Sequence, residues 1–213
     1  MLLQTCYANV SPAQFNRDLD EKEWTILGTD PVSERVWCFS TMRRIRATVD
    51  GHPVTAFYSG DTASRRDARG AATSAGTRLV IRKMFYERMI SEDEDHFYWF
   101  MISSTYKSYR LLPMIFRDFA PGPKRDLSPG ERKIVAELSR LKHIAFNASS
   151  GIVTLANPSL PVDSPESEST RTQDVYAGFF HSANPNAASG DRLATLTEIS
   201  LSNLTPLGAR MVS

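Results

Sequence analysis

The stretch YSGDTASRRDARGAATSAGTRLV, residues 58–80, decides the fold. A strand that ends at Tyr58–Gly60 is followed by small and basic residues, and a helix is predicted to begin near Thr73–Gly76. At such a helix start the unpaired backbone N–H groups and the positive end of the helix dipole point the same way. The stretch therefore predicts an anion site, and the small residues at 70–76 let a pyrophosphate approach the backbone closely.

The sequence before this stretch predicts a helix and then antiparallel strands. Ser11 and Pro12 are typical of the N-cap and first turn of a helix, here over 11–20. Asp50-Gly51 is the strongest hairpin signal and predicts pairing of strands at about 35–49 and 52–60. We expect residues 61–76 to form a loop that runs into a helix rather than a strand.

The sequence after the stretch predicts mainly helices. The expected elements are a helix over about 73–90, a buried strand at 96–104, a helix over 105–119 interrupted at Pro113, a helix over 128–146 with Ser128 as its N-cap, a short strand within 150–158, a mobile loop at 157–174, and then a helix, a strand and a short terminal helix. The expected architecture is therefore mixed α and β.

Composition excludes several classes of function. Among 213 residues there are 25 Lys+Arg and 24 Asp+Glu, which gives a net charge of +1 and no basic excess for binding nucleic acid. The two cysteines, Cys6 and Cys38, predict neither a disulfide framework nor a zinc site, and the four scattered histidines give no metal-binding spacing. With no signal peptide and no long apolar run, we expect a cytoplasmic protein without a membrane span or metal.

Several runs resemble the GNAT superfamily of N-acyltransferases. They are FYSGDT, ARG, FYWFMISSTYKSYRLLPMIFRDFAP and FFHSANPNAASGDRL, which also resemble a poorly characterised bacterial family of GNAT-like proteins. The resemblance covers roughly residues 20–205. It implies an α/β (α+β) fold with a mixed, mostly antiparallel central sheet flanked by helices on both faces. It also implies one domain over 1–213, with a core at about 20–125 and a C-terminal extension at about 126–213.

The resemblance implies a binding site for an acyl thioester, either acyl-coenzyme A or an acyl carrier protein. In this superfamily the fourth and fifth strands, here 52–60 and 96–104, splay apart around the thioester arm. The residues implied at the cleft are Phe57, Tyr58 and Ser59 on one lip and Ser103 and Ser104 on the other. The residues implied at the pyrophosphate are Arg69, Gly70, Ala71, Ala72, Thr73 and Ser74. Ala72 and Ser74 stand where the superfamily has glycines, which is compatible with a carrier protein as donor.

Three residues are candidates for catalysis. Asp61 follows a strand end and is a general base, a cap of the following turn or a binder of the substrate amine; a cap is the commonest of the three. The superfamily's general-acid tyrosine is replaced by Ile115 in this chain, so Tyr106 and Tyr109, one turn earlier, are the available substitutes. Tyrosines on an aromatic-rich helix more often pack in a core.

Two functions from different classes follow from the resemblance. The first is acyl transfer from a thioester to a small-molecule amine or a peptide by direct attack, with an acyl carrier protein as a partner and a homodimer as the assembly. The alternative is a GNAT-like protein that binds a ligand or partner without catalysis. A tailoring enzyme for a natural product is a third interpretation.

Overall fold

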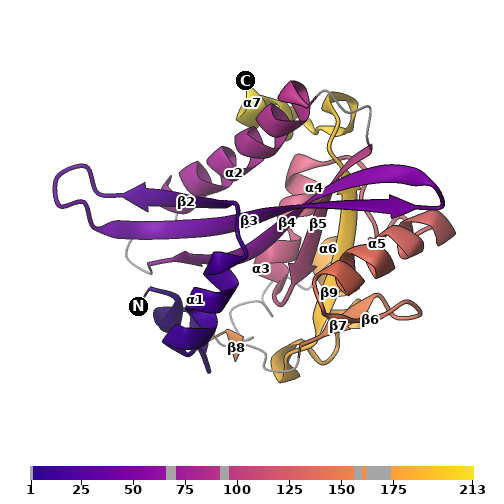
Figure 1. The fold of residues 1–213 in the computed structure, drawn as a ribbon, viewed down its shortest axis with the longest axis horizontal. Coiled ribbons are helices and arrows are strands. Elements are labelled where there is room, and N and C mark those ends of the chain that lie inside the picture. Colours follow the sequence, from indigo (N-terminus) through magenta and orange to yellow (C-terminus); the bar gives the residue numbers. More distant parts are fainter. Residues whose placement is uncertain (1, 66–70, 92–95, 156–159, 162–173) are drawn as a thin grey trace.

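The computed structural model describes residues 2–65, 71–91, 96–155, 160–161 and 174–213 (Figure 1). Its strands are β1 (Tyr7–Ala8), β2 (Trp24–Thr29), β3 (Val36–Val49), β4 (His52–Ser64), β5 (His96–Ser103), β6 (Ala145–Asn147), β7 (Ile152–Thr154), β8 (Leu160–Pro161) and β9 (Arg192–Glu198). Its α-helices are α1 (Pro12–Asp20), α2 (Ala71–Ile90), α3 (Tyr106–Tyr109), α4 (Leu111–Ile115), α5 (Pro129–Leu141), α6 (Val175–Ala183) and α7 (Pro206–Val212).

Seven of these strands form one mixed sheet in the order β2-β3-β4-β5-β9-β7-β6. The β4–β5 pair is parallel, and the other neighbouring pairs are antiparallel. Helices pack against both faces of the sheet, with α5 crossing one face in Figure 1. The predicted fold class, a mostly antiparallel mixed sheet flanked by helices on both faces, is confirmed.

Each face of the sheet carries its own hydrophobic core. On one face, Met42 and Phe57 pack with Ile81 and Met84 of α2, and α3, α4, α6 and α7 extend the same core. On the other face, Phe100 packs with apolar side chains of α5. The alternation along β4 and β5 explains this division, because successive side chains of a strand point to opposite faces.

The hairpin and the helix starts form as the sequence predicts. Asp50 and Gly51 adopt positive φ angles of 50° and 82°, and Val49 pairs with His52. The Ser11 side chain accepts a hydrogen bond from Gln14 N at the start of α1. Ser128 and Glu131 form a capping box at the start of α5.

The prediction of a loop over 61–76 is wrong for residues 61–64, because β4 continues to Ser64. A register shift between Ser40 and Met42 of β3 places Gly60 and Asp61 opposite a single residue, Thr41. Such a bulge absorbs the extra residue and lets the strand continue pairing. Residues 66–70, in the rest of this stretch, lie outside the described residues.

Two expected helices also end or break elsewhere. The break between α3 and α4 falls at Arg110 rather than Pro113, because proline in the first turn of α4 needs no N–H partner. The helix expected over 128–146 ends at Leu141, where His143 takes a positive φ of 55°, and residues 145–147 become strand β6. Short local patterns did not reveal that β6 pairs with β7.

The C-terminal part of the chain enters the same sheet. Strand β9 lies between β5 and β7, with Phe100 opposite Leu196. The mobile loop expected at 157–174 falls almost entirely outside the described residues; within it, Leu160–Pro161 form β8 and Asp174 caps α6. Over the described ranges, no helix has the length and apolar character needed to cross a membrane.

Candidate functional site

The parallel β4–β5 ladder stops before either strand ends. Pairing runs from Val54–His96 to Tyr58–Phe100, while β4 continues to Ser64 and β5 to Ser103. Beyond Tyr58 and Phe100, β4 stays paired with β3 and β5 stays paired with β9. The pairing of the two halves of the sheet therefore ends at this point, at the strands where the family resemblance implies a cleft.

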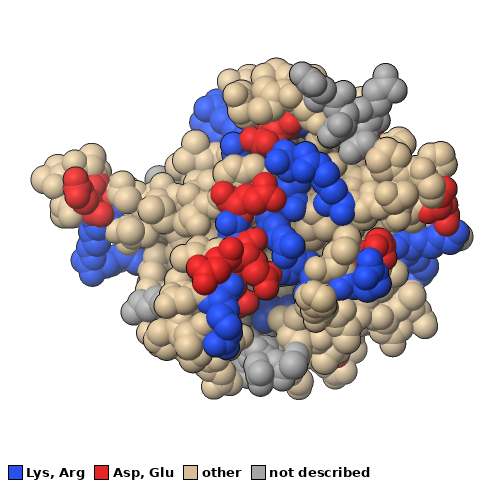
Figure 2. All heavy atoms as spheres, in the orientation of Figure 1, with Lys and Arg blue, Asp and Glu red and all other residues tan. Residues whose placement is uncertain are grey.

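Titratable side chains from four segments surround the end of this ladder. We call them the Asp61 cluster: Tyr58 and Asp61 of β4, Lys22 after α1, Lys142 after α5 and Arg192 at the start of β9. Asp18 and Glu21 border the cluster on the α1 side. Figure 2 shows acidic and basic side chains gathered together in the middle of this face, around α1.

The Asp61 carboxylate has no hydrogen-bond or ion-pair partner among the residues that the structure describes, although it is partly buried. Burial raises its pKa above the usual range, and the Asp18 carboxylate raises it further. This pKa is lowered by the positive charges of Lys22, Arg192 and Lys142, but by less than burial and Asp18 raise it. A carboxylate of raised pKa without a partner is typical of a functional group rather than a structural cap.

Tyr58 lies beside Asp61 with its ring against Phe100, at a centroid distance of 5.8 Å. Burial, followed by the Asp61 carboxylate, raises the pKa of Tyr58 to about 12. The Lys142 ammonium lies 5.1 Å from the centre of the Tyr58 ring and also pairs with Glu21. These contacts hold the Tyr58 ring in place while the Asp61 carboxylate stays unpartnered.

The N-terminal segment packs against the same end of β4. Leu3 is buried with Phe39 and Ala63, and Tyr7 and Phe15 pack around them. Burial raises the pKa of Tyr7, and Arg192 and Asp61 are among the charges that act on it. The segment therefore forms one wall beside the Asp61 cluster.

The predicted cleft residues lie on both faces of the sheet: Tyr58 packs on the α5 side, whereas Phe57 packs on the α2 side. Phe57 is fully buried in the α2-side core, and Ser59 accepts a hydrogen bond of 2.6 Å from the Trp99 indole. Ser103 is fully buried, and its hydroxyl has no partner within the described part of the chain. Ser104 follows the end of β5.

The predicted phosphate site is described only in part. Ala71, Ala72, Thr73 and Ser74 form the first turn of α2, so this helix begins slightly earlier than the sequence predicts. Arg69 and Gly70 lie outside the described residues. The role of these six residues stays a prediction.

Tyr106 and Tyr109 lie in the core on the face opposite the Asp61 cluster. Tyr106 is 3% exposed and donates a hydrogen bond to the Asp174 carboxylate. Tyr109 is fully buried and donates a hydrogen bond of 3.1 Å to Pro121 O. Burial raises the pKa of Tyr109 strongly. The structure thus does not bring these two tyrosines together with Asp61.

Sequence reasoning found Asp61 but missed the cations around it. Lys22, Lys142 and Arg192 belong to segments far apart in the chain, and none has a motif of its own. Only the tertiary arrangement, with the ends of α1 and α5 and the start of β9 meeting at β4, brings them together.

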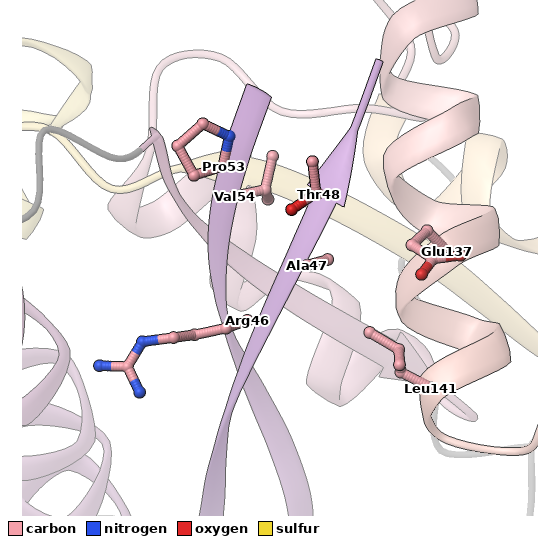
Figure 3. A pocket seen from close by; sticks show the side chains of 7 residues that line it. All are labelled: Arg46, Ala47, Thr48, Pro53, Val54, Glu137 and Leu141. Atoms are coloured by element: carbon pink, nitrogen blue, oxygen red, sulfur yellow. The ribbon is translucent and has the colours of Figure 1, made fainter. Parts of the chain in front are cut away.

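A separate groove of about 390 Å³ lies between the β3–β4 hairpin and α5 (Figure 3). Its lining includes Ala47, Val54 and Leu141 but no member of the Asp61 cluster. In Figure 3, Arg46 points away from Glu137 and Leu141, so its charge does not converge with the Glu137 carboxylate in the groove.

Comparison with known proteins gives only distant similarities. No family model matches the chain, and no curated protein matches it in sequence. Among solved structures, the chain is similar to a conserved protein of unknown function from Enterococcus faecalis, called a probable N-acyltransferase. The two chains share 15% sequence identity with a TM-score of 0.41, and the match covers 52% of this chain and 27% of the Enterococcus protein. The chain is also similar to a mutant Bacillus halodurans protein, with 14% identity, a TM-score of 0.38, and coverage of 51% and 70%. These similarities do not establish a family or a function.

Proposed function

We propose that the protein transfers an acyl group from a thioester to an amine, with the reaction at the Asp61 cluster. The observation that carries this proposal is the unpartnered Asp61 carboxylate at the point where the β4–β5 ladder ends. The GNAT resemblance of the sequence supports it, since in that superfamily the thioester arm lies between these two strands.

The proposed transfer requires the protein to position the thioester and to accept one proton from the amine. The strand edges beyond Tyr58 and Phe100 offer backbone groups to the amides of a pantetheine arm, which holds the thioester carbonyl in place. Asp61 accepts the proton that the attacking amine loses. Its raised pKa makes it a better base than an ordinary aspartate, provided that it is ionised.

The start of α2 is proposed to bind the phosphates of coenzyme A. We expect Arg69→Glu to weaken binding of acyl-coenzyme A and to leave binding of the matching acyl-pantetheine unchanged, because only the former carries the nucleotide phosphates. Calorimetric titration of both ligands measures this difference. Equal curves for the wild type and the variant with acyl-coenzyme A would contradict the phosphate site and favour a carrier protein as donor.

Tyr109 provides a test of how the leaving thiolate is protonated. We expect Tyr109→Phe to lower the free energy of unfolding by about 1–3 kcal/mol, because the buried Pro121 carbonyl loses its donor. The transfer rate should stay unchanged, since this hydroxyl lies in the core opposite Asp61. Urea unfolding and steady-state kinetics measure the two effects. A rate loss of about 100-fold with normal thioester binding would instead identify Tyr109 as the general acid.

A second candidate function is thioester or partner binding without catalysis. The observation that favours it is that both candidate acids, Tyr106 and Tyr109, already donate hydrogen bonds inside the core. A thermal-shift screen with coenzyme A and acyl thioesters, followed by an assay with a panel of amines, separates the two functions. Thioester binding without any amide product would contradict the enzyme proposal and support the binding protein.

A further inference from the structure

Lys22 occupies a position that the bulge in β4 creates for it. Its aliphatic chain lies on Gly60, where an added Cβ would come within 2.5 Å of Lys22 Cε. Its ammonium donates a hydrogen bond of 2.7 Å to Asp18 O, near the end of α1. The glycine next to Asp61 thus makes room for a lysine beside the end of the β4–β5 ladder.

The surroundings of Lys22 lower its pKa. Burial lowers the pKa of Lys22, and the neighbouring Lys142 ammonium lowers it further. The pKa of Lys22 is raised by three carboxylates, Asp18 and Glu21 on the α1 side and Asp61 on β4, but by less than burial and Lys142 lower it. A lysine with a lowered pKa is nucleophilic at a lower pH than an exposed lysine.

Lys22 and Asp61 form no direct ion pair within the described structure, although the charge of each affects the pKa of the other. Burial raises the pKa of Asp61 and lowers that of Lys22, so the two values move toward each other. Transfer of a proton from the ammonium to the carboxylate is therefore easier than for an exposed pair.

We propose that Lys22 is a covalent acylation site that accepts the acyl group from an acyl thioester bound between β4 and β5. The inference rests on the proposed thioester site and gives it an acceptor within the chain. The neutral amine attacks the thioester carbonyl, a C–N bond forms and the C–S bond breaks. Asp61 takes the proton that the nitrogen loses, and the departing thiolate takes a proton from water. No oxidant or reductant is required.

The test uses the intact protein with acetyl-coenzyme A and, separately, with S-acetyl-N-acetylcysteamine, which lacks the nucleotide. Intact mass and peptide mapping over time locate the acyl group. We expect a single acetyl group to appear first on Lys22, several-fold faster than on Lys133, an exposed lysine that pairs with Asp50 at 2.6 Å. Lys22→Arg should abolish this early product, and the control Lys133→Arg should leave it unchanged.

Gly60→Ala provides a second variant that retains the lysine. The new methyl group displaces the Lys22 side chain and the buried Thr41 hydroxyl, so we expect slower acylation of Lys22 together with a lower melting temperature. Equal labelling of Lys22 and Lys133 in the wild type would overturn the inference, as would an undiminished early product in Lys22→Arg.

The same experiment with a free amine added separates this inference from the proposed function. Acylation of Lys22 without any acylated free amine would support the inference and contradict transfer to small amines. Acylation of the free amine while Lys22 stays unmodified would overturn the inference and leave the proposed function intact.

Discussion

Replacing Asp61 with asparagine is expected to lower the rate of acyl transfer by about 10²- to 10⁴-fold, the usual contribution of a general base. Asparagine keeps the shape of the side chain but cannot accept the proton from the amine. Thioester binding should stay normal, because Asp61 has no part in holding the thioester arm. Steady-state kinetics together with calorimetry separate the two effects, and Asp50→Asn on the exposed hairpin serves as the matched control. Unchanged turnover in Asp61→Asn would remove the base from the proposed mechanism.

The same substitution has a predictable effect on stability. Because the folded state raises the pKa of Asp61, it holds this proton to a higher pH than the unfolded chain does. Wild-type stability therefore falls as the pH rises from the usual aspartate range through the raised pKa. Asp61→Asn lacks this loss, so its melting temperature relative to the wild type should be higher at pH 7 than at pH 3.5. The activity of the wild type should rise over the same interval as Asp61 ionises.

Phe100→Ala should cause the largest loss of stability, about 3–5 kcal/mol, because a fully buried aromatic side chain leaves a cavity. Phe100 closes the last β4–β5 pair opposite Tyr58 and packs with Val135 and Leu138. Urea unfolding measures the change, with Leu27→Ala at a 52% exposed site as control. A loss below about 1 kcal/mol in Phe100→Ala would contradict the packing described for this face.

The parts of the fold that depend on local signals could be predicted from the sequence. Asp50-Gly51 specifies its hairpin through positive φ angles, and Ser11 and Ser128 specify helix starts through their side-chain caps. The parts that depend on tertiary pairing could not. Nothing within Asp61–Ser64 shows that the long partner strand β3 continues alongside it after a bulge.

The candidate site shows the same division. Asp61 stood out because it follows a glycine at a strand end, but its raised pKa results from burial and from Asp18 on another element. Lys22 gave no signal in the sequence, because its place depends on the missing side chain of Gly60. Spacing along the chain makes Tyr106 and Tyr109 candidates, whereas their burial depends on packing against α6.

Hydrogen–deuterium exchange with a non-reactive thioether analogue of acyl-coenzyme A tests the central claim most directly. The proposal places the ligand's pantetheine arm against the strand edges beyond the end of the β4–β5 ladder. Amides in peptides covering 59–64 and 101–103 should therefore exchange more slowly when the analogue is bound. Unchanged exchange in these peptides, with protection confined to the groove residues around 46–54 and 137–141, would contradict the account.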